Sequence, residues 1–315
     1  AIYRGYEGLV NNEIKEFTTE NVSNIIQRGG TILKTARSKE FVTPEGRQKA
    51  YDNMKANGID ALIVIGGNGS LTGARIFAEE FDVPCIGLPG TIDNDLNGTD
   101  LTIGYDTTLN TIMECVDKIR DTASSHERLF IVEVMGRDAG WIALNAAVAG
   151  GAEVCLLPEF PYDIEKVKEK LESRFVNDRG FAVVVISEGA KPKDGQQVFE
   201  VSKEVGYENV KLGGIGQKFI EQMKAAGFKH DMRETTLGHL QRGGVPVAYD
   251  RVLASQFGVK AFEMVLNQEY GKMVAYRHPE IIGVPLAEAV SKPNLVTPDN
   301  RLLHTAKGLG IVFGD

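Results

Sequence analysis

The sequence predicts an α/β protein with a mostly parallel sheet covered by helices. Short apolar runs alternate along the chain with segments in which apolar residues recur at every third or fourth position, as expected for strands that alternate with helices. Turns rich in glycine or carboxylate follow several of these runs, where an open parallel sheet presents its chemistry. With 315 residues, 43% of them hydrophobic, the chain can bury the core of one large domain or two ordinary domains.

The apolar runs predict the strands, and the periodic segments predict the helices between them. Leu71–Phe81, Leu109–Ile119 and Val167–Phe175 keep helical spacing, and Asp163 precedes the last of these as a cap. Lys191–Gln197 interrupts the rhythm with charge and glycine and is expected to be a surface excursion. The predicted strands are Ala61–Ile65, Val83–Leu88, Leu129–Val134, Ala152–Leu157 and Phe181–Ile186.

Composition narrows the class of protein. The net charge of -8 argues against a nucleic-acid surface. Cys85, Cys115 and Cys155 are odd in number and lie in apolar runs, which predicts buried thiols in a reducing compartment. No apolar run approaches the roughly twenty residues of a membrane span, and no signal peptide precedes the first polar segment. We therefore expect a cytoplasmic enzyme.

The motif Pro89–Asp95 follows one of the predicted strands directly. It sets Asp93 and Asp95 two residues apart, so that one carboxylate can accept a proton while the other holds a cation, as phosphoryl transfer requires. An isolated Asp-x-Asp is more often a turn whose aspartates cap backbone groups. The accompanying motifs favour the chemical interpretation.

Three further segments accompany the two aspartates. Gly66–Ser70 lies between a predicted strand and a predicted helix, so its backbone N–H groups can cradle a phosphate, although glycines also serve merely to turn a chain. Phe130–Gly140 is another strand that runs into a glycine turn, with Arg137 at its mouth. Further on, His239 and Arg242 can bind a sugar phosphate.

In this order, the segments resemble the 6-phosphofructokinase family. The resemblance covers about residues 1 to 265 well and the rest loosely. The matching segments are Tyr3–Leu9, Gly29–Arg37, Gly66–Ser70, Pro89–Asp95, Lys118–Arg128, Met135–Arg137 and His239–Ser255.

The resemblance implies two doubly wound, mostly parallel α/β domains with the active site in the cleft between them. Residues 1–104 with about 246–295 would form a larger nucleotide-binding domain, and residues 105–245 with about 296–315 a smaller sugar-phosphate domain. The chain would cross between them near Tyr105, near Val245 and again near the C-terminus.

The implied activity is transfer of the ATP γ-phosphate to fructose 6-phosphate. By motif position Asp93 is the general base, Thr91 donates to a phosphoryl oxygen, and Arg137 neutralises charge on the transferring group. Asp95 faces Mg²⁺. A surface ion pair is the alternative for Arg137.

The resemblance also implies a sugar-phosphate site shared between subunits. Arg242 and His239 come from one chain, Arg128 and Arg233 reach in from a neighbour, and Glu188 accepts from sugar hydroxyls. Catalysis would then need self-association, expected as a homotetramer. The full substrate set is Thr91, Asp93, Asp95, Arg128, Met135, Gly136, Arg137, Glu188, Arg233, His239 and Arg242.

On the nucleotide side, the chain departs from its family at Asn68, where an aspartate usually faces Mg²⁺; an amide oxygen can ligate the ion but carries no charge. Gly69 and Gly90 leave room for a nucleotide and favour ATP, whereas Lys211–Gly216 looks more like the branch that mixes ATP and pyrophosphate users. A pyrophosphate-dependent enzyme and a non-catalytic homologue therefore stay open. The predicted nucleotide-side residues are Tyr6, Arg37, Ser38, Gly67, Asn68, Gly69 and Ser70.

Two further expectations concern the amino terminus and regulation. The family normally opens with a strand and a phosphate-binding glycine loop, about thirty-five residues that are absent before Ala1; because their removal would expose a strand edge, we expect a truncated form of a longer chain. Arg120 and Glu153 match positions that bind an effector nucleotide in bacterial relatives. The alternative for Arg120 is a cap on the helix that ends near Ile119. Allosteric control stays open.

Overall fold

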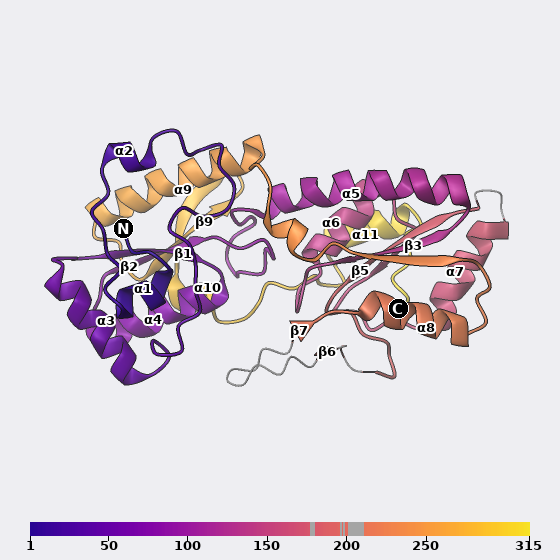
Figure 1. Cartoon of the computed structure of the whole chain (residues 1–315), viewed down its shortest axis with the longest axis horizontal. Helices are drawn as coiled ribbons and strands as arrows, with labels where there is room; N and C mark the ends of the chain where they lie inside the picture. The colour runs from indigo at the N-terminus through magenta and orange to yellow at the C-terminus, as the bar shows by residue number, and fades with distance from the viewer. Residues whose placement is uncertain (177–179, 196, 198, 201–210) are drawn as a thin grey trace. The chain divides into compact units, whose positions relative to one another are not determined.

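The computed structural model describes all residues except 177–179, 196, 198 and 201–210 (Figure 1). The chain forms two compact units. Unit 1 comprises Ala1–Ile92, Leu96–Asp106 and Gly243–Lys292, and unit 2 comprises Asp93–Asp95, Thr107–Arg242 and Pro293–Asp315. The assignment of a nucleotide to the first and a sugar phosphate to the second stays a prediction.

The sheet of unit 1 has the strand order β1-β2-β9-β10. The first three strands are parallel, and β10 runs antiparallel to β9. Helices cover both faces, because strand side chains alternate: Leu62 and Cys85 lie in the core with α4, whereas Ile86 and Leu88 pack with α9. The elements are α1 (Gly5–Val10), α2 (Thr19–Val22), α3 (Pro44–Ala56), β1 (Leu62–Gly66), α4 (Asn68–Phe81), β2 (Cys85–Pro89), α9 (Ala248–Leu266), β9 (Lys272–Arg277), β10 (Glu280–Pro285) and α10 (Leu286–Ala289).

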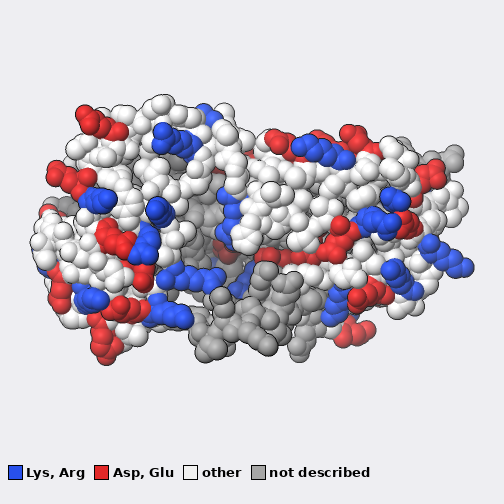
Figure 2. Space-filling model, in the orientation of Figure 1, with Lys and Arg blue, Asp and Glu red and all other residues white. Residues whose placement is uncertain are grey.

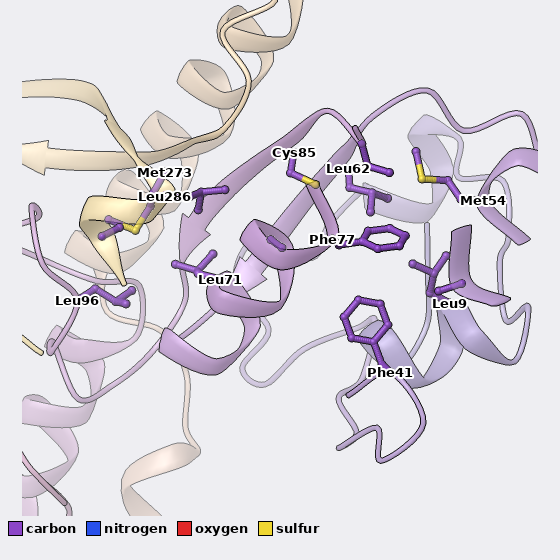
Figure 3. Close-up of a cluster of buried hydrophobic side chains, with 14 of the residues drawn as sticks. Leu9, Phe41, Met54, Leu62, Leu71, Phe77, Cys85, Leu96, Met273 and Leu286 are labelled. Carbon is purple, nitrogen blue, oxygen red and sulfur yellow. The ribbon is translucent and has the colours of Figure 1, made fainter. Parts of the chain in front are cut away.

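The α4 face of this sheet holds the larger apolar cluster. Figure 3 shows Phe77 of α4 between the strand residues Leu62 and Cys85 and the side chains of Leu9 and Phe41. Phe77 is fully buried. Replacing it by alanine would cost about 3–5 kcal/mol, so this contact anchors the helix that begins at the glycine loop.

Unit 2 holds a four-stranded parallel sheet in the order β4-β5-β3-β8. The strands β3 and β5 are buried on both faces, which explains their continuous apolar runs. Side chains of α7 and α8 share one apolar cluster with the sheet, and α5 and α6 lie on its other side (Figure 1). The elements are α5 (Tyr105–His126, which begins in unit 1), β3 (Leu129–Val134), α6 (Trp141–Gly150), β4 (Val154–Leu156), α7 (Ile164–Val176), β5 (Ala182–Ser187), β6 (Phe199–Glu200), β7 (Lys211–Leu212), α8 (Ile215–Ala225), β8 (Met232–Thr236), η1 (Gly238–Arg242, a 3₁₀ helix) and α11 (Arg301–Gly308).

The predicted fold class is confirmed, and each predicted strand is present within two residues of its expected ends. The predicted cap is confirmed as well, since the backbone N–H of Glu165 donates to Asp163 Oδ1 at 3.0 Å. The prediction of buried thiols is right for Cys85 and Cys155 and wrong for Cys115, which is half-buried.

Other expectations differ from the structure in extent. The strands β8, β9 and β10 were not predicted; β8 reads Met-Arg-Glu-Thr-Thr and lies at the edge of its sheet, where polar side chains face water. The segment Lys191–Gln197 is half-buried or exposed where it is described, and residue 196 lies outside the described residues. In the described part of the chain, no helix is long and apolar enough to cross a membrane.

Charge is mixed on the face of the molecule that Figure 2 presents. On the face that Figure 2 presents, acidic and basic side chains are interspersed among uncharged ones. This distribution is in keeping with the acidic net charge of the sequence.

Candidate active site

The carboxyl ends of the unit 2 strands meet at one edge of the sheet. Arg137 follows β3, Glu188 follows β5, and both His239 and Arg242 lie in η1, which follows β8. Because β3 lies between β5 and β8 and all three are parallel, the three loops are neighbours. The structure therefore brings these four sequence-predicted residues to the same edge.

The loop that carries Arg137 is held by buried polar contacts. Gly136 has a φ of 132°, and a Cβ there would lie 2.6 Å from Ser187 Oγ and 2.8 Å from the carbonyl oxygen of Ala139. Ser187 Oγ donates to the carbonyl of Gly136 at 2.6 Å. Only glycine fits this turn, so the backbone conformation explains why Gly136 stands at this predicted site position.

Gln241 is a supporting residue that the sequence analysis missed. Its side chain is 1% exposed; Oε1 accepts the N–H of Met135 at 3.1 Å, and Nε2 donates to the carbonyl of Gly238 at 3.1 Å. It thus joins the loop after β3 to the 3₁₀ helix of His239 and Arg242. The sequence position of Gln241 could have indicated this role, because it stands between the predicted ligands His239 and Arg242. Ser187, which supports the loop of Arg137, likewise directly precedes the predicted ligand Glu188.

Residues Asp93–Asp95, which we call the aspartate loop, belong to unit 2. Burial raises the pKa of Asp93, Arg242 lowers it and Asp138 raises it. Burial and the negative charge of Asp93 raise the pKa of Asp95 to about 6. A carboxylate whose pKa is raised in this way is a stronger base when it is ionised, which suits general-base catalysis.

Glu188 shares this electrostatic environment. Burial raises its pKa most, a backbone hydrogen bond from Gly136 lowers it, Asp93 and Glu133 raise it, and Arg242 lowers it. Arg242 therefore interacts with both Asp93 and Glu188. The edge therefore combines negative groups with the exposed cation of Arg242.

Two predicted ligands lie at the opposite edge of the same sheet. Arg128 directly precedes β3, and Arg233 lies near the start of β8. Both bind Asp231, at 2.7 Å from Arg128 Nε and 2.5 Å from Arg233 Nη1. The six residues of β3 separate Arg128 from the loop of Arg137, a span of about 20 Å. Within one chain, the structure does not bring these two arginines to the carboxyl edge.

The glycine loop in unit 1 forms the start of α4. Gly67 is the N-cap, and Asn68, Gly69 and Ser70 form the first turn. A Cβ on Gly67 would lie 3.3 Å from Thr91 Cβ, whereas a Cβ on Gly69 would meet no atom within 4 Å. Since the first N–H groups of a helix lack intrahelical partners, this turn can bind an anion.

Tyr6 packs beneath the same turn. Its ring stacks on Phe41 with 3.9 Å between centroids, and its hydroxyl donates to the carbonyl of Ser70 at 2.6 Å. Burial raises the pKa of Tyr6. Ser38 Oγ accepts the N–H of Phe41 at 3.2 Å, while Arg37 is exposed. The side-chain oxygens of Tyr6 and Ser38 thus support the backbone in this part of unit 1, and its nucleotide role stays a prediction.

Comparison with known proteins identifies the family. The profile described as Phosphofructokinase matches residues 1–265. The chain belongs to the phosphofructokinase family. The ATP-dependent 6-phosphofructokinase 2 of Bacteroides thetaiotaomicron is 54% identical over 311 residues, which are 99% of this chain and 88% of that protein. The ATP-dependent 6-phosphofructokinase of Cytophaga hutchinsonii is 44% identical over 309 residues, 98% of this chain and 87% of that protein.

A solved structure supports the same membership. The phosphofructokinase from Saccharomyces cerevisiae superposes with a TM-score of 0.81 at 36% identity. The match covers 92% of this chain and 41% of the yeast chain, so this phosphofructokinase-family chain spans less than half of the yeast chain's length.

The residues present fit a divalent cation at the aspartate loop. Burial, and after it the negative charge of Asp93, raises the pKa of Asp95, and a cation would offset both effects. Among the described residues, no group of three or more His, Cys, Asp or Glu side chains could hold a metal without other ligands. A cation here would take further oxygens from substrate phosphates and water.

The predicted effector residues are bound to other parts of unit 2. Glu153 is buried; its Oε1 pairs with Arg174 Nη2 at 2.8 Å, and its Oε2 accepts the N–H of Val183 at 2.8 Å. Arg120 donates to the carbonyls of Gly150 and Gly151, both at 2.8 Å. The alternative that Arg120 caps its own helix is wrong, because α5 continues to His126 and Arg120 caps the end of α6 instead. The effector role stays a prediction.

Proposed function

We propose that the protein is an ATP-dependent 6-phosphofructokinase. It transfers the γ-phosphate of ATP to the 1-hydroxyl of fructose 6-phosphate and yields fructose 1,6-bisphosphate and ADP. The observation that carries this proposal is the grouping of Asp93, Glu188 and Arg242 in one electrostatic environment at the edge where Arg137 lies. The names of relatives that match nearly the whole chain support the choice of reaction.

The chemistry assigns one role to each group at this edge. Asp93 takes the proton of the attacking hydroxyl, an O–P bond forms to the γ-phosphorus, and the bond to the β-phosphate oxygen breaks. Arg137 stabilises negative charge on the transferring group, since a guanidinium offers a planar fork of donors. Thr91, which belongs to unit 1, is proposed to donate to a phosphoryl oxygen.

The sugar phosphate is bound mainly by cations. His239 and Arg242 bind the 6-phosphate and Glu188 accepts from the sugar hydroxyls, while the N–H of Gly136 and the buried Met135 help to shape the loop beside them. Arg128 and Arg233 complete the phosphate site of a neighbouring subunit. Their position at the amino edge supports a site that is shared between subunits, since these two arginines and Arg242 lie at opposite edges of the sheet in one chain; the homotetramer stays a prediction.

The nucleotide binds at the start of α4 through Gly67, Asn68, Gly69 and Ser70, with Tyr6 and Ser38 beneath and Arg37 exposed nearby in sequence. Asp95 would hold Mg²⁺, which would neutralise phosphate charge, and Asn68 stays a predicted ligand of the ion. The open space at Gly69 supports ATP over pyrophosphate as donor. We place the enzyme in glycolysis and in the cytoplasm.

A donor assay tests the proposal. Turnover of fructose 6-phosphate is measured with ATP and with pyrophosphate, each with Mg²⁺, in coupled assays for fructose 1,6-bisphosphate. We expect turnover with ATP and at least a hundredfold lower kcat/KM with pyrophosphate, about 2.7 kcal/mol in transition-state free energy. A preference for pyrophosphate would identify the pyrophosphate-dependent relative, and no turnover with either donor would identify a non-catalytic homologue.

A further inference from the structure

Glu159 joins two distant parts of unit 2 at the carboxyl edge of its sheet. Its Oε1 accepts the backbone N–H of Gly140 at 2.9 Å and that of Val296, also at 2.9 Å. Gly140 ends the loop of Arg137 and is the N-cap of α6. Val296 belongs to the segment Pro293–Val296, which returns to unit 2 near the C-terminus. We call this segment the connecting segment.

The connecting segment also contacts the aspartate loop. The N–H of Asn294 donates to the carbonyl of Asp95 at 2.7 Å, and the indole N–H of Trp141 donates to the carbonyl of Asn294 at 2.7 Å. Trp141 is the first residue of α6. The loop of Arg137 is therefore linked to Asp95 by the hydrogen bonds of Glu159 and Asn294 and by the backbone between Asn294 and Val296.

The position of Glu159 is tightly defined. Its second oxygen, Oε2, is buried and has no hydrogen-bond partner within the part of the chain that the structure describes. A Cβ on Gly140 would lie 2.8 Å from this oxygen, so the approach of the loop to the carboxylate depends on glycine. Burial raises the pKa of Glu159, and the N–H groups of Gly140 and Val296 lower it.

A buried carboxylate at this position lowers the stability of the folded state, and its advantage is that it accepts hydrogen bonds. Leaving one buried oxygen without a partner destabilises the folded state, whereas an apolar side chain of similar size would avoid that cost. What an apolar residue cannot do is accept two backbone N–H groups from separate segments at one atom. The geometry thus favours a role in fixing the two loops.

We propose that Glu159 is a positioning residue for phosphoryl transfer, which holds the loop of Arg137 in register with the aspartate loop through the connecting segment. This inference rests on the proposed function. The effect of Glu159 is exerted through the backbone of Gly140 and Val296.

The test compares Glu159→Ala with Glu159→Gln. The alanine variant loses both hydrogen bonds, while the amide oxygen of glutamine can still accept both N–H groups. We expect Glu159→Ala to lower kcat at least tenfold with less than a threefold change in the KM for ATP, and Glu159→Gln to stay within threefold of the wild type in both. Asn300→Ala is the matched control, because Asn300 Oδ1 also accepts two backbone N–H groups, of Leu302 and Leu303, but caps α11.

Hydrogen–deuterium exchange supplies a readout that needs no turnover. In Glu159→Ala, amide exchange should accelerate at least tenfold in both residues 136–140 and 293–296, and in Glu159→Gln and Asn300→Ala it should not. If the wild-type protein shows no turnover but Glu159→Ala accelerates exchange in both segments, the proposed function fails, and the link that Glu159 makes between the two segments still stands. The proposal is overturned if folded Glu159→Ala keeps wild-type exchange in either segment, if its kcat stays within threefold in an active enzyme, or if Asn300→Ala loses as much kcat.

Discussion

The two edges of the unit 2 sheet carry charged residues in contrasting environments. At the carboxyl edge, the loops that bear Arg137 and Arg242 are joined by Gln241, which is buried. At the amino edge, Arg128 and Arg233 share Asp231, and the three side chains are 32%, 51% and 44% exposed.

The contrast indicates which edge of the sheet can hold reacting groups in fixed positions within one chain. Buried hydrogen bonds fix a loop because breaking them leaves polar groups without partners, whereas exposed ion pairs exchange readily with water. The carboxyl edge is therefore suited to positioning reacting groups. The amino edge presents cations whose present partner is easily replaced, as binding to a ligand on a neighbouring subunit would require.

The largest expected effect tests whether the carboxyl edge performs the reaction. Asp93→Asn should lower kcat by about a hundredfold or more and leave the Kd for fructose 6-phosphate within about threefold, because the lost interaction belongs to the transition state. Steady-state kinetics and calorimetry measure the two quantities. Asp100→Asn, at an exposed aspartate that accepts the N–H of His278, serves as control. Near-normal kcat in Asp93→Asn would remove the base assignment.

The next effect tests whether the amino edge serves a neighbour. Arg128→Ala should raise the KM for fructose 6-phosphate about tenfold, since a hydrogen bond to a charged group contributes about 1.5–3 kcal/mol. Arg242→Ala should do the same from the other edge. When the two variants are mixed and allowed to exchange subunits, some sites with both arginines should form and low-KM activity should return. Mixed oligomers that show no recovery would place the whole site in one chain.

A stability comparison measures the contrast between the edges directly. Gln241→Leu leaves the buried N–H of Met135 without its acceptor and should lower the free energy of unfolding by about 1–3 kcal/mol. Asp231→Asn breaks exposed ion pairs and should change it by less than about 1 kcal/mol. Urea denaturation measures both. Equal losses would mean that the two edges are supported alike.

The smallest expected effect concerns the pH dependence of stability. The folded-state pKa of Asp95 is about 6, above its ordinary value, so the folded protein binds more protons than the unfolded chain between about pH 4 and pH 6. Ionisation of Asp95 thus costs stability as the pH rises through this window. Asp95→Asn should stabilise the ligand-free protein by about 1–2 kcal/mol at pH 7.5 and have little effect at pH 4, measured by thermal unfolding. A pH-independent difference would contradict the raised pKa.

Much of the candidate site could be predicted from sequence because its chemistry is local. Asp93, Arg137 and Arg242 each stand directly after an apolar run or in a short distinctive motif, and parallel strands place such positions together. Their supports could not be predicted in this way. Glu159, for example, accepts from a residue 137 positions away, and no periodicity in the sequence marks that pairing.

By itself, the sequence determined the strands β1 to β5, the start of α4 at its glycine loop and the identity of the charged groups, because apolar runs and turn residues act over a few neighbouring positions. The tertiary structure decided which charged groups meet. It separated Arg128 and Arg233 from Arg137 by the length of β3, and it bound Glu153 to Arg174. Burial also raised the pKa of Asp95, which depends on the atoms that surround it in space and not on its neighbours along the chain.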